Sequence, residues 1–112
     1  MKIAIPVVQG RLAVHFGHCE EFALFEVDQE TSSIVGSERL AAPSHQPGLL
    51  PQWLREHGTD LIIAGGMGRR AQSLFAQGGI EVVVGAALDE PEQLIKEYLD
   101  GVLEAGENIC DY

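Results

Sequence analysis

The sequence predicts a three-layer α/β fold with a five-stranded mixed sheet, and three observations support this fold class. Short apolar runs of strand length alternate with segments whose apolar residues recur every three or four positions. Clusters of glycine, proline and polar residues separate the two kinds of segment. The chain has 112 residues, which is enough for one domain to bury a core. We therefore expect one domain over residues 1–112, with residues 105–112 as a flexible tail.

The N-terminal part of the chain carries the signals of three strands. Residues 2–8 place apolar side chains alternately on two faces, as a strand requires. Residues 22–28 repeat this alternation. A polar turn then leads to a third run, residues 33–40, which Gly36 weakens. The second and third strands are expected to form a hairpin.

The apolar period changes in the middle of the chain. Apolar residues recur at helical spacing from Leu49 to His57, and Gly58 supplies a stop signal for this helix. Residues 60–64 form a short, fully apolar run that is typical of a buried parallel strand. This part of the sequence therefore predicts a helix followed by a parallel strand.

A second helix and strand follow, and a third helix ends the domain. The second helix has an apolar stripe and ends at Gly78; its stripe comprises Met67, Ala71, Leu74 and Phe75. Residues 81–84 form the next buried strand. Asp89 is expected to cap the last helix, with Pro91 in its first turn and Glu92 completing a capping box. The face expected to meet the core comprises Leu94, Ile95, Tyr98, Leu99, Val102 and Leu103.

The predicted order of elements is β-β-β-α-β-α-β-α. Strands joined through a helix must be parallel, and such crossovers are right-handed. The hairpin then lies on one side of the sheet and the parallel strands on the other. This order corresponds to a ribonuclease-H-like arrangement.

The charge distribution excludes one class of function. The net charge is −10, and residues 87–112 supply −7 of it, from eight acidic residues and Lys96. Such a segment repels phosphate backbones, so nucleic-acid binding is not expected. The acidic residues are expected to form a solvated helix face, and the alternative is a docking surface for a positively charged protein.

The sequence predicts a cytoplasmic protein with no membrane contact. Its first residues lack the apolar core and cleavage site of a secretory signal. No apolar run approaches the ~20 residues that a membrane-spanning helix needs. In the cytoplasm, the two cysteines are expected to be reduced thiols or metal ligands rather than a disulfide.

The densest cluster of metal-binding side chains lies at residues 15–19. His15, His18 and Cys19 are three of the six histidine and cysteine residues in the chain. Imidazole and thiolate bind zinc, copper, iron and iron–sulfur clusters, and the loop follows a strand end, where α/β sheets form ligand crevices. The sequence has no C-x-x-C pair, so we expect an open or shared metal site. The alternative is that the imidazoles are exposed and that Cys19 is a small buried hydrophobe.

Further donors are expected to complete this site. His45, in the loop before the first helix, could fold over the 15–19 loop, and Cys110 stands near the C-terminus. Either residue can equally be incidental, and a homodimer could complete the site instead. We rank His18 and Cys19 ahead of His15, His45 and Cys110 as ligands. Phe16 is expected to anchor the loop by burial, and His57 to have a structural role at a helix end.

A glycine-rich turn with two arginines joins the fourth predicted strand to the second helix. It contains Gly65, Gly66, Gly68, Arg69 and Arg70. Glycines allow close backbone approach, and the N–H groups of a helix N-terminus bind anions. The motif matches neither common nucleotide-binding pattern, and tight strand-to-helix packing also explains it. A small-anion or nucleotide-binding regulatory module is therefore the alternative function, and no catalytic constellation is present.

Four segments carry a resemblance to a known family: residues 1–6, 15–22, 45–54 and, most specifically, 62–82. The chain resembles the dinitrogenase iron–molybdenum cofactor biosynthesis family, the NifX-like and NifB C-terminal-like domains. The resemblance implies the ribonuclease-H-like fold. It also implies a non-catalytic protein that binds, carries or stores iron–sulfur or molybdenum-containing clusters and exchanges them with donor or acceptor proteins. Such clusters are anionic, so the glycine-rich turn and its arginines would hold them by hydrogen bonds.

Overall fold

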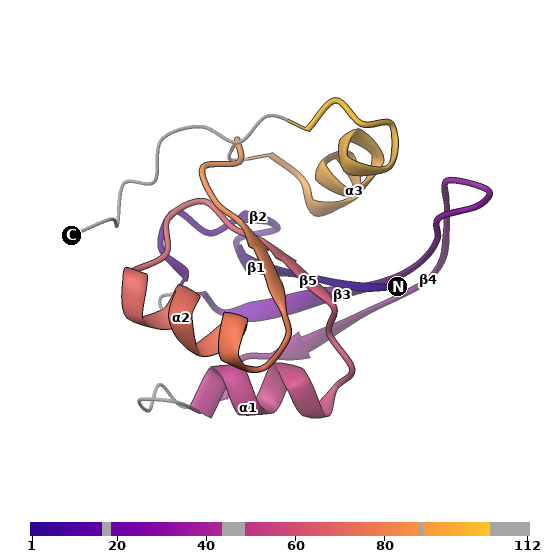
Figure 1. Ribbon diagram of the computed structural model, residues 1–112. Coiled ribbons are helices and arrows are strands. Elements are labelled where there is room, and N and C mark those ends of the chain that lie inside the picture. The colour runs from indigo at the N-terminus through magenta and orange to yellow at the C-terminus, as the bar shows by residue number, and fades with distance from the viewer. Residues whose placement is uncertain (17–18, 44–48, 88, 104–112) are drawn as a thin grey trace.

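The computed structural model describes residues 1–16, 19–43, 49–87 and 89–103. It shows a mixed α/β fold in which three helices cover two faces of an open mixed sheet (Figure 1). The predicted fold class is therefore confirmed at this level, whereas the comparison with ribonuclease H stays a prediction. The predicted tail at residues 105–112 lies outside the described residues.

The sheet is built around its first strand. The order of the main strands is β4-β3-β1-β5-β6. β1 (Lys2–Val8) is antiparallel to β3 (Glu21–Asp28) and parallel to β5 (Leu61–Ile63). β4 (Ser33–Ala41) forms the hairpin partner of β3, and β6 (Glu81–Val83) runs parallel to β5. The predicted hairpin and parallel strands are both present.

The prediction of five strands omitted β2 (Arg11–Leu12), which pairs antiparallel with the end of β1. The chain reverses at Gln9 and Gly10, whose φ angles of 53° and 81° both lie in the left-handed region. A two-residue turn with two positive φ angles fits the twist of a hairpin. The sequence did not reveal β2 because two residues are too few to show an alternating pattern.

The hairpin of β3 and β4 contains a bulge. Glu26 pairs with Gly36, and Val27 pairs with Ile34, so Val35 has no opposite residue. Val35 is 62% exposed, as expected on this edge strand, most of whose residues are exposed. The weakening expected at Gly36 therefore appears as a local irregularity in a continuous strand.

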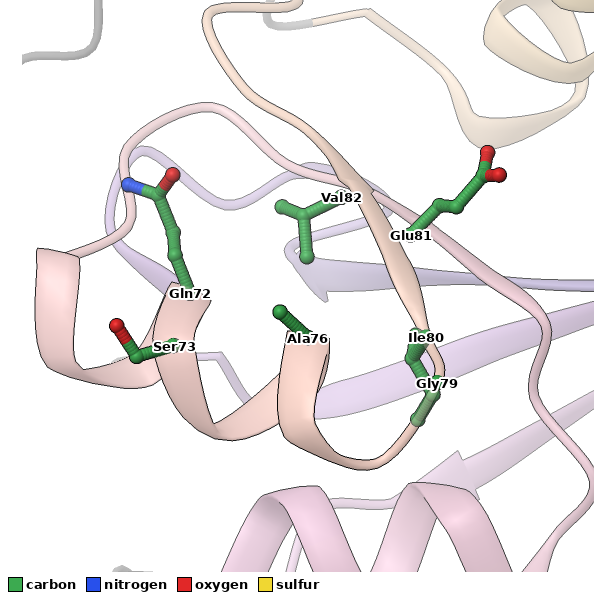
Figure 2. Close-up of a pocket in the computed structure, with 7 residues that line it drawn as sticks. All are labelled: Gln72, Ser73, Ala76, Gly79, Ile80, Glu81 and Val82. Carbon is green, nitrogen blue, oxygen red and sulfur yellow. The ribbon is translucent and has the colours of Figure 1, made fainter.

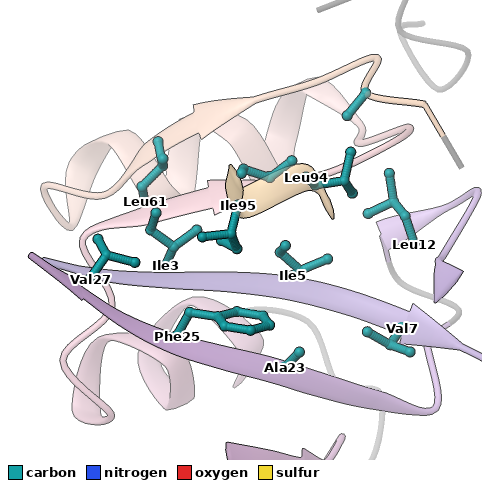
Figure 3. Close-up of a cluster of buried hydrophobic side chains, with 12 residues drawn as sticks. Ile3, Ile5, Val7, Leu12, Ala23, Phe25, Val27, Leu61, Leu94 and Ile95 are labelled. Atoms are coloured by element: carbon teal, nitrogen blue, oxygen red, sulfur yellow. The ribbon is translucent and has the colours of Figure 1, made fainter. Parts of the chain in front are cut away.

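The face of the sheet under α3 (Pro91–Leu99) buries one hydrophobic cluster. Ile3 and Ile5 of β1 point to this face and pack with Leu94 and Ile95 of the helix (Figure 3). All four side chains are fully buried. The alternation predicted for the first strand is confirmed by this arrangement.

The opposite face of the sheet packs against two helices. α1 (Leu49–Glu56) contributes Leu54, and α2 (Arg69–Gln77) contributes Phe75, to a second cluster that includes Phe22 of β3. The two helices lie together on the side of the sheet away from α3 (Figure 1). No helix in the described ranges is long and apolar enough to cross a membrane.

The predicted limits of the last helix were wrong at both ends. Glu90, and not Asp89, is the N-cap residue, and no side chain caps the helix there. The Asp89 carboxylate instead accepts a hydrogen bond from the Glu90 N–H at 2.9 Å, so the expected capping box does not form. At the other end, Gly101 adopts a φ of 76° and stops the helix, which leaves Val102 62% exposed rather than in the core.

This difference predicts unequal effects of two aliphatic substitutions. Leu94→Ala should lower the free energy of unfolding by about 2–5 kcal/mol because it leaves a cavity between α3 and the sheet. Val102→Ala should change it by less than about 0.5 kcal/mol, since the side chain is already in water. Urea denaturation followed by circular dichroism measures both effects, and equal losses would contradict the assigned end of α3.

Candidate functional site

Two loops that are distant in sequence are hydrogen-bonded at the carboxyl ends of β1 and β5. The Phe16 N–H donates to the Gly66 carbonyl at 2.8 Å, and the Gly66 N–H donates to the Val14 carbonyl at 2.7 Å. His15 and Gly66 thereby form a parallel bridge. The loop that carries His15 and Cys19, here called the histidine–cysteine loop, therefore meets the glycine-rich turn at one edge of the sheet. The sequence predicted that both segments would contact the same metal cluster, but it did not predict this backbone pairing.

Hydrogen bonds to β1 also hold both ends of the histidine–cysteine loop. The Ala13 N–H donates to the Pro6 carbonyl, and the Glu20 N–H donates to the Val7 carbonyl, each at 2.9 Å. The Glu20 carboxylate accepts a further hydrogen bond from the Gln9 N–H at 2.9 Å. The segment between residues 13 and 20 thus starts and ends at fixed points.

Phe16 anchors the middle of this loop, as expected. Its side chain is only 5% exposed. Its ring lies 5.3 Å from the ring of Phe75 and 5.7 Å from the ring of Phe22, measured between centroids. The residue that separates the candidate ligands is therefore part of the core beneath α1 and α2.

The two candidate ligands that the structure describes differ in environment. His15 is exposed, whereas Cys19 is a half-buried free thiol that packs against the cluster beneath α1 and α2. Burial raises the pKa of the Cys19 thiol from about 9 to about 11, and a hydrogen bond from the backbone opposes this shift. A metal would have to displace the thiol proton on binding. Both interpretations of the loop fit these environments.

The remaining candidate ligands, His18, His45 and Cys110, lie outside the described residues. Among the described residues, no three His, Cys, Asp or Glu side chains group together in a way that could hold a metal ion. His15 and Cys19 therefore do not make a complete ligand set by themselves. A complete set would need donors from the other parts of the chain, from a second copy, or from the sulfide of a bound cluster.

The glycine-rich turn follows the carboxyl end of β5 and is largely buried. Gly65 and Gly66 are buried, and Gly68 is the N-cap of α2 without a side-chain cap. Arg69 and Arg70 occupy the first helical turn and are exposed. The backbone amides of a helix start and two guanidinium groups thus lie next to the segment that pairs with His15.

Gln72 supports this turn from within α2. Its side-chain amide donates a hydrogen bond to the Met67 carbonyl at 2.9 Å. Gln72 also lines a hollow of about 750 Å³ between α2 and the outer edge of β6 (Figure 2). A smaller hollow of about 260 Å³ lies beside His15 and is bordered by Leu12 and Val14. Neither hollow could be anticipated from the sequence, because both depend on the spacing between elements.

His57 lies at the end of α1 and makes packing contacts. Its ring lies 4.6 Å from the ring of Trp53 in an edge-to-face arrangement. Its backbone carbonyl accepts a hydrogen bond from the Lys2 ammonium group at 2.9 Å. These contacts agree with the structural role expected for His57.

Comparisons with known proteins point to one family. A family model described as dinitrogenase iron-molybdenum cofactor matches residues 1–101. The uncharacterized protein MJ0580 of Methanocaldococcus jannaschii is 35% identical over an alignment of 109 positions, and the match covers 93% of this chain and 90% of that protein. These matches extend over both the histidine–cysteine loop and the glycine-rich turn.

Solved structures show the same fold. The crystal structure of PH0822 superimposes with a TM-score of 0.86 at 28% identity, over 94% of each chain. The apo form of the orange protein from Desulfovibrio gigas superimposes with a TM-score of 0.72 at 23% identity, over 96% of this chain and 93% of that one. The comparisons give no support to a small-anion or nucleotide-binding regulatory module.

The environment of Cys19 predicts an unusual pH dependence of thiol alkylation. In Cys110→Ala, Cys19 is the only thiol, and the thiolate is the reactive form. Because burial raises the thiol pKa to about 11, the alkylation rate of the folded protein should still rise about tenfold per pH unit between pH 8 and 10. Iodoacetamide labelling followed by mass spectrometry measures the rate. The urea-unfolded protein is the control and should level off near pH 9, and the same plateau in the folded protein would contradict the prediction.

Proposed function

Since the chain belongs to the dinitrogenase iron-molybdenum cofactor family, we propose that it is a non-catalytic binding, carrier or storage protein for iron–sulfur or molybdenum-containing clusters. The observation that carries this proposal is the direct backbone pairing of His15 with Gly66. It supports the proposal because it brings the loop with the candidate ligands to the same edge of the sheet as the glycine-rich turn and its two arginines. The cluster is the cargo of the protein, and not a permanent structural metal.

The chemistry of the two loops suits an anionic cluster. His15 and Cys19 offer an imidazole and a thiol, to which we add His18, His45 and Cys110 as proposed ligands. The Gly65–Gly68 amides and the guanidinium groups of Arg69 and Arg70 would donate hydrogen bonds to sulfide or oxo groups. Two adjacent positive charges at this edge are notable in a chain of net charge −10. They favour an anion over a bare metal cation.

The proposed carrier works in the cytoplasm with donor and acceptor proteins. Glu90, Glu92 and Asp100 are exposed on or beside α3, on the face opposite α1 and α2. This acidic surface would attract a positively charged partner, and the attraction would weaken as salt rises. We further propose that residues 1–112 form a single domain with a flexible tail. A homodimer would complete the ligand set.

Anaerobic reconstitution tests the function directly. The apo-protein is incubated with ferrous iron and sulfide, with and without tetrathiomolybdate, and then desalted. We expect visible charge-transfer absorption and metal that stays with the protein through desalting. Bovine serum albumin, carried through the same steps, controls for adventitious sulfide. Loss of all metal and colour from the desalted protein would refute cluster binding.

A variant series tests the ranking of the ligands. Cys19→Ala should lower metal retention more than Cys110→Ala, because the ends of the Cys19 loop are fixed by hydrogen bonds to β1. His18→Ala should likewise lower retention more than His15→Ala. His57→Ala is the control and should retain as much metal as the wild type, since His57 lies at the end of α1 and is not one of the proposed ligands. Metal analysis by mass spectrometry measures retention, and loss in Cys110→Ala alone would move the site to the C-terminus.

A further inference from the structure

We propose that Phe16 is a positioning residue for the candidate ligands His15 and Cys19, and that it fixes the position of their loop relative to α1 and α2. This inference rests on the proposed function for its effect on metal binding. Its effect on the loop itself can be measured without any metal.

Phe16 lies between two other rings in a row of four aromatic side chains. Its ring meets Phe75 of α2 edge-to-face at 5.3 Å and meets Phe22 of β3 at 5.7 Å. Phe22 in turn lies 5.5 Å from the ring of Trp53 on α1. Such pairs are favourable beyond the apolar area that they bury. The row therefore connects the loop to a strand and to both helices on this face of the sheet.

Backbone hydrogen bonds also hold the main chain at Phe16. Its N–H donates to the carbonyl of Gly66, whose own N–H donates to Val14. His15 lies between these two hydrogen bonds. The backbone bridge fixes where His15 sits along the edge, and the buried Phe16 ring prevents the segment from rotating about that bridge.

The cluster that contains Phe16 also forms the environment of Cys19. Phe16, Phe22 and Cys19 all pack within the cluster beneath α1 and α2. Cys19 lies three positions after Phe16, and the next residue, Glu20, donates a backbone hydrogen bond to Val7 of β1. Phe16 and Glu20 thus anchor the chain on the two sides of Cys19. Loss of the Phe16 ring would remove one of these two anchors.

The chain offers a matched control for this role. Phe25 also lies on the sheet and is 1% exposed, but it packs in the cluster beneath α3. Replacing either ring by leucine removes a similar amount of buried apolar surface. If Phe16 acted only through the global stability of the protein, the two substitutions would have equal effects on the loop.

The metal-independent test measures the exposure of the Cys19 thiol. In the Cys110→Ala background, iodoacetamide should alkylate Cys19 about tenfold faster in Phe16→Leu than in the parent, because the loop opens locally. Phe25→Leu should react at the parent rate. Both variants are compared under conditions where their urea midpoints show that they are equally folded, and Phe16→Met replaces Phe16→Leu if the latter fails to fold. Equal rates in the Phe16 and Phe25 variants would overturn the inference.

The metal-dependent test uses the same pair of substitutions with both cysteines present. After anaerobic reconstitution with iron and sulfide, Phe16→Leu should retain about tenfold less metal than the wild type, as expected when support for a ligand is lost. Phe25→Leu should retain as much as the wild type, and an equal loss in both variants would overturn the positioning role. If the wild type itself retains no metal, the proposed function fails, while the alkylation rates still decide whether Phe16 holds the loop.

Discussion

The parallel pairing of β1 with β5 is the constraint on which the rest of the molecule depends. Only two pairs of residues form the ladder itself, Ile3 with Leu61 and Ala4 with Ile62. The pairing resumes beyond both strands as the bridge between His15 and Gly66. Because parallel strands end at the same edge, the chain that returns from β2 meets the chain that leaves β5 at this bridge. The fold thereby sets side by side two candidate functional segments that are about fifty positions apart in sequence.

The elements of the fold could be predicted where a long periodic pattern set them. The alternation of Ile3 and Ile5 against Ala4 predicted both faces of β1 correctly, because each face packs on a different helical layer. Short-range details were less accessible. β2 has too few residues for a pattern, and the first turn of α3 depends on which of two adjacent acids, Asp89 or Glu90, begins it.

The candidate site could be predicted in its residue types but not in its arrangement. The spacing of His15 and Cys19 indicated ligands, and burial of Phe16 between them was expected and is confirmed. The hydrogen bonds of Gly66 and the support of Met67 by Gln72 were not predicted, since they arise from the packing of distant segments. The burial of the Cys19 thiol likewise depends on the whole cluster around it. The residue types in the sequence therefore indicate candidate donors, whereas tertiary packing determines where each donor lies and how deeply it is buried.

The bulge at Val35 has a consequence for how copies of this chain can associate. β4 forms one edge of the sheet, and its nine residues would otherwise be a long template for strand-by-strand aggregation. The extra residue interrupts the regular alternation of backbone donors and acceptors along that edge. Arg39, farther along β4, is held by Glu21 at 3.1 Å and Glu92 at 3.3 Å, which places charge on the same strand. The bulge and the charged side chain both make the exposed edge of β4 a poor template for a strand from a second copy.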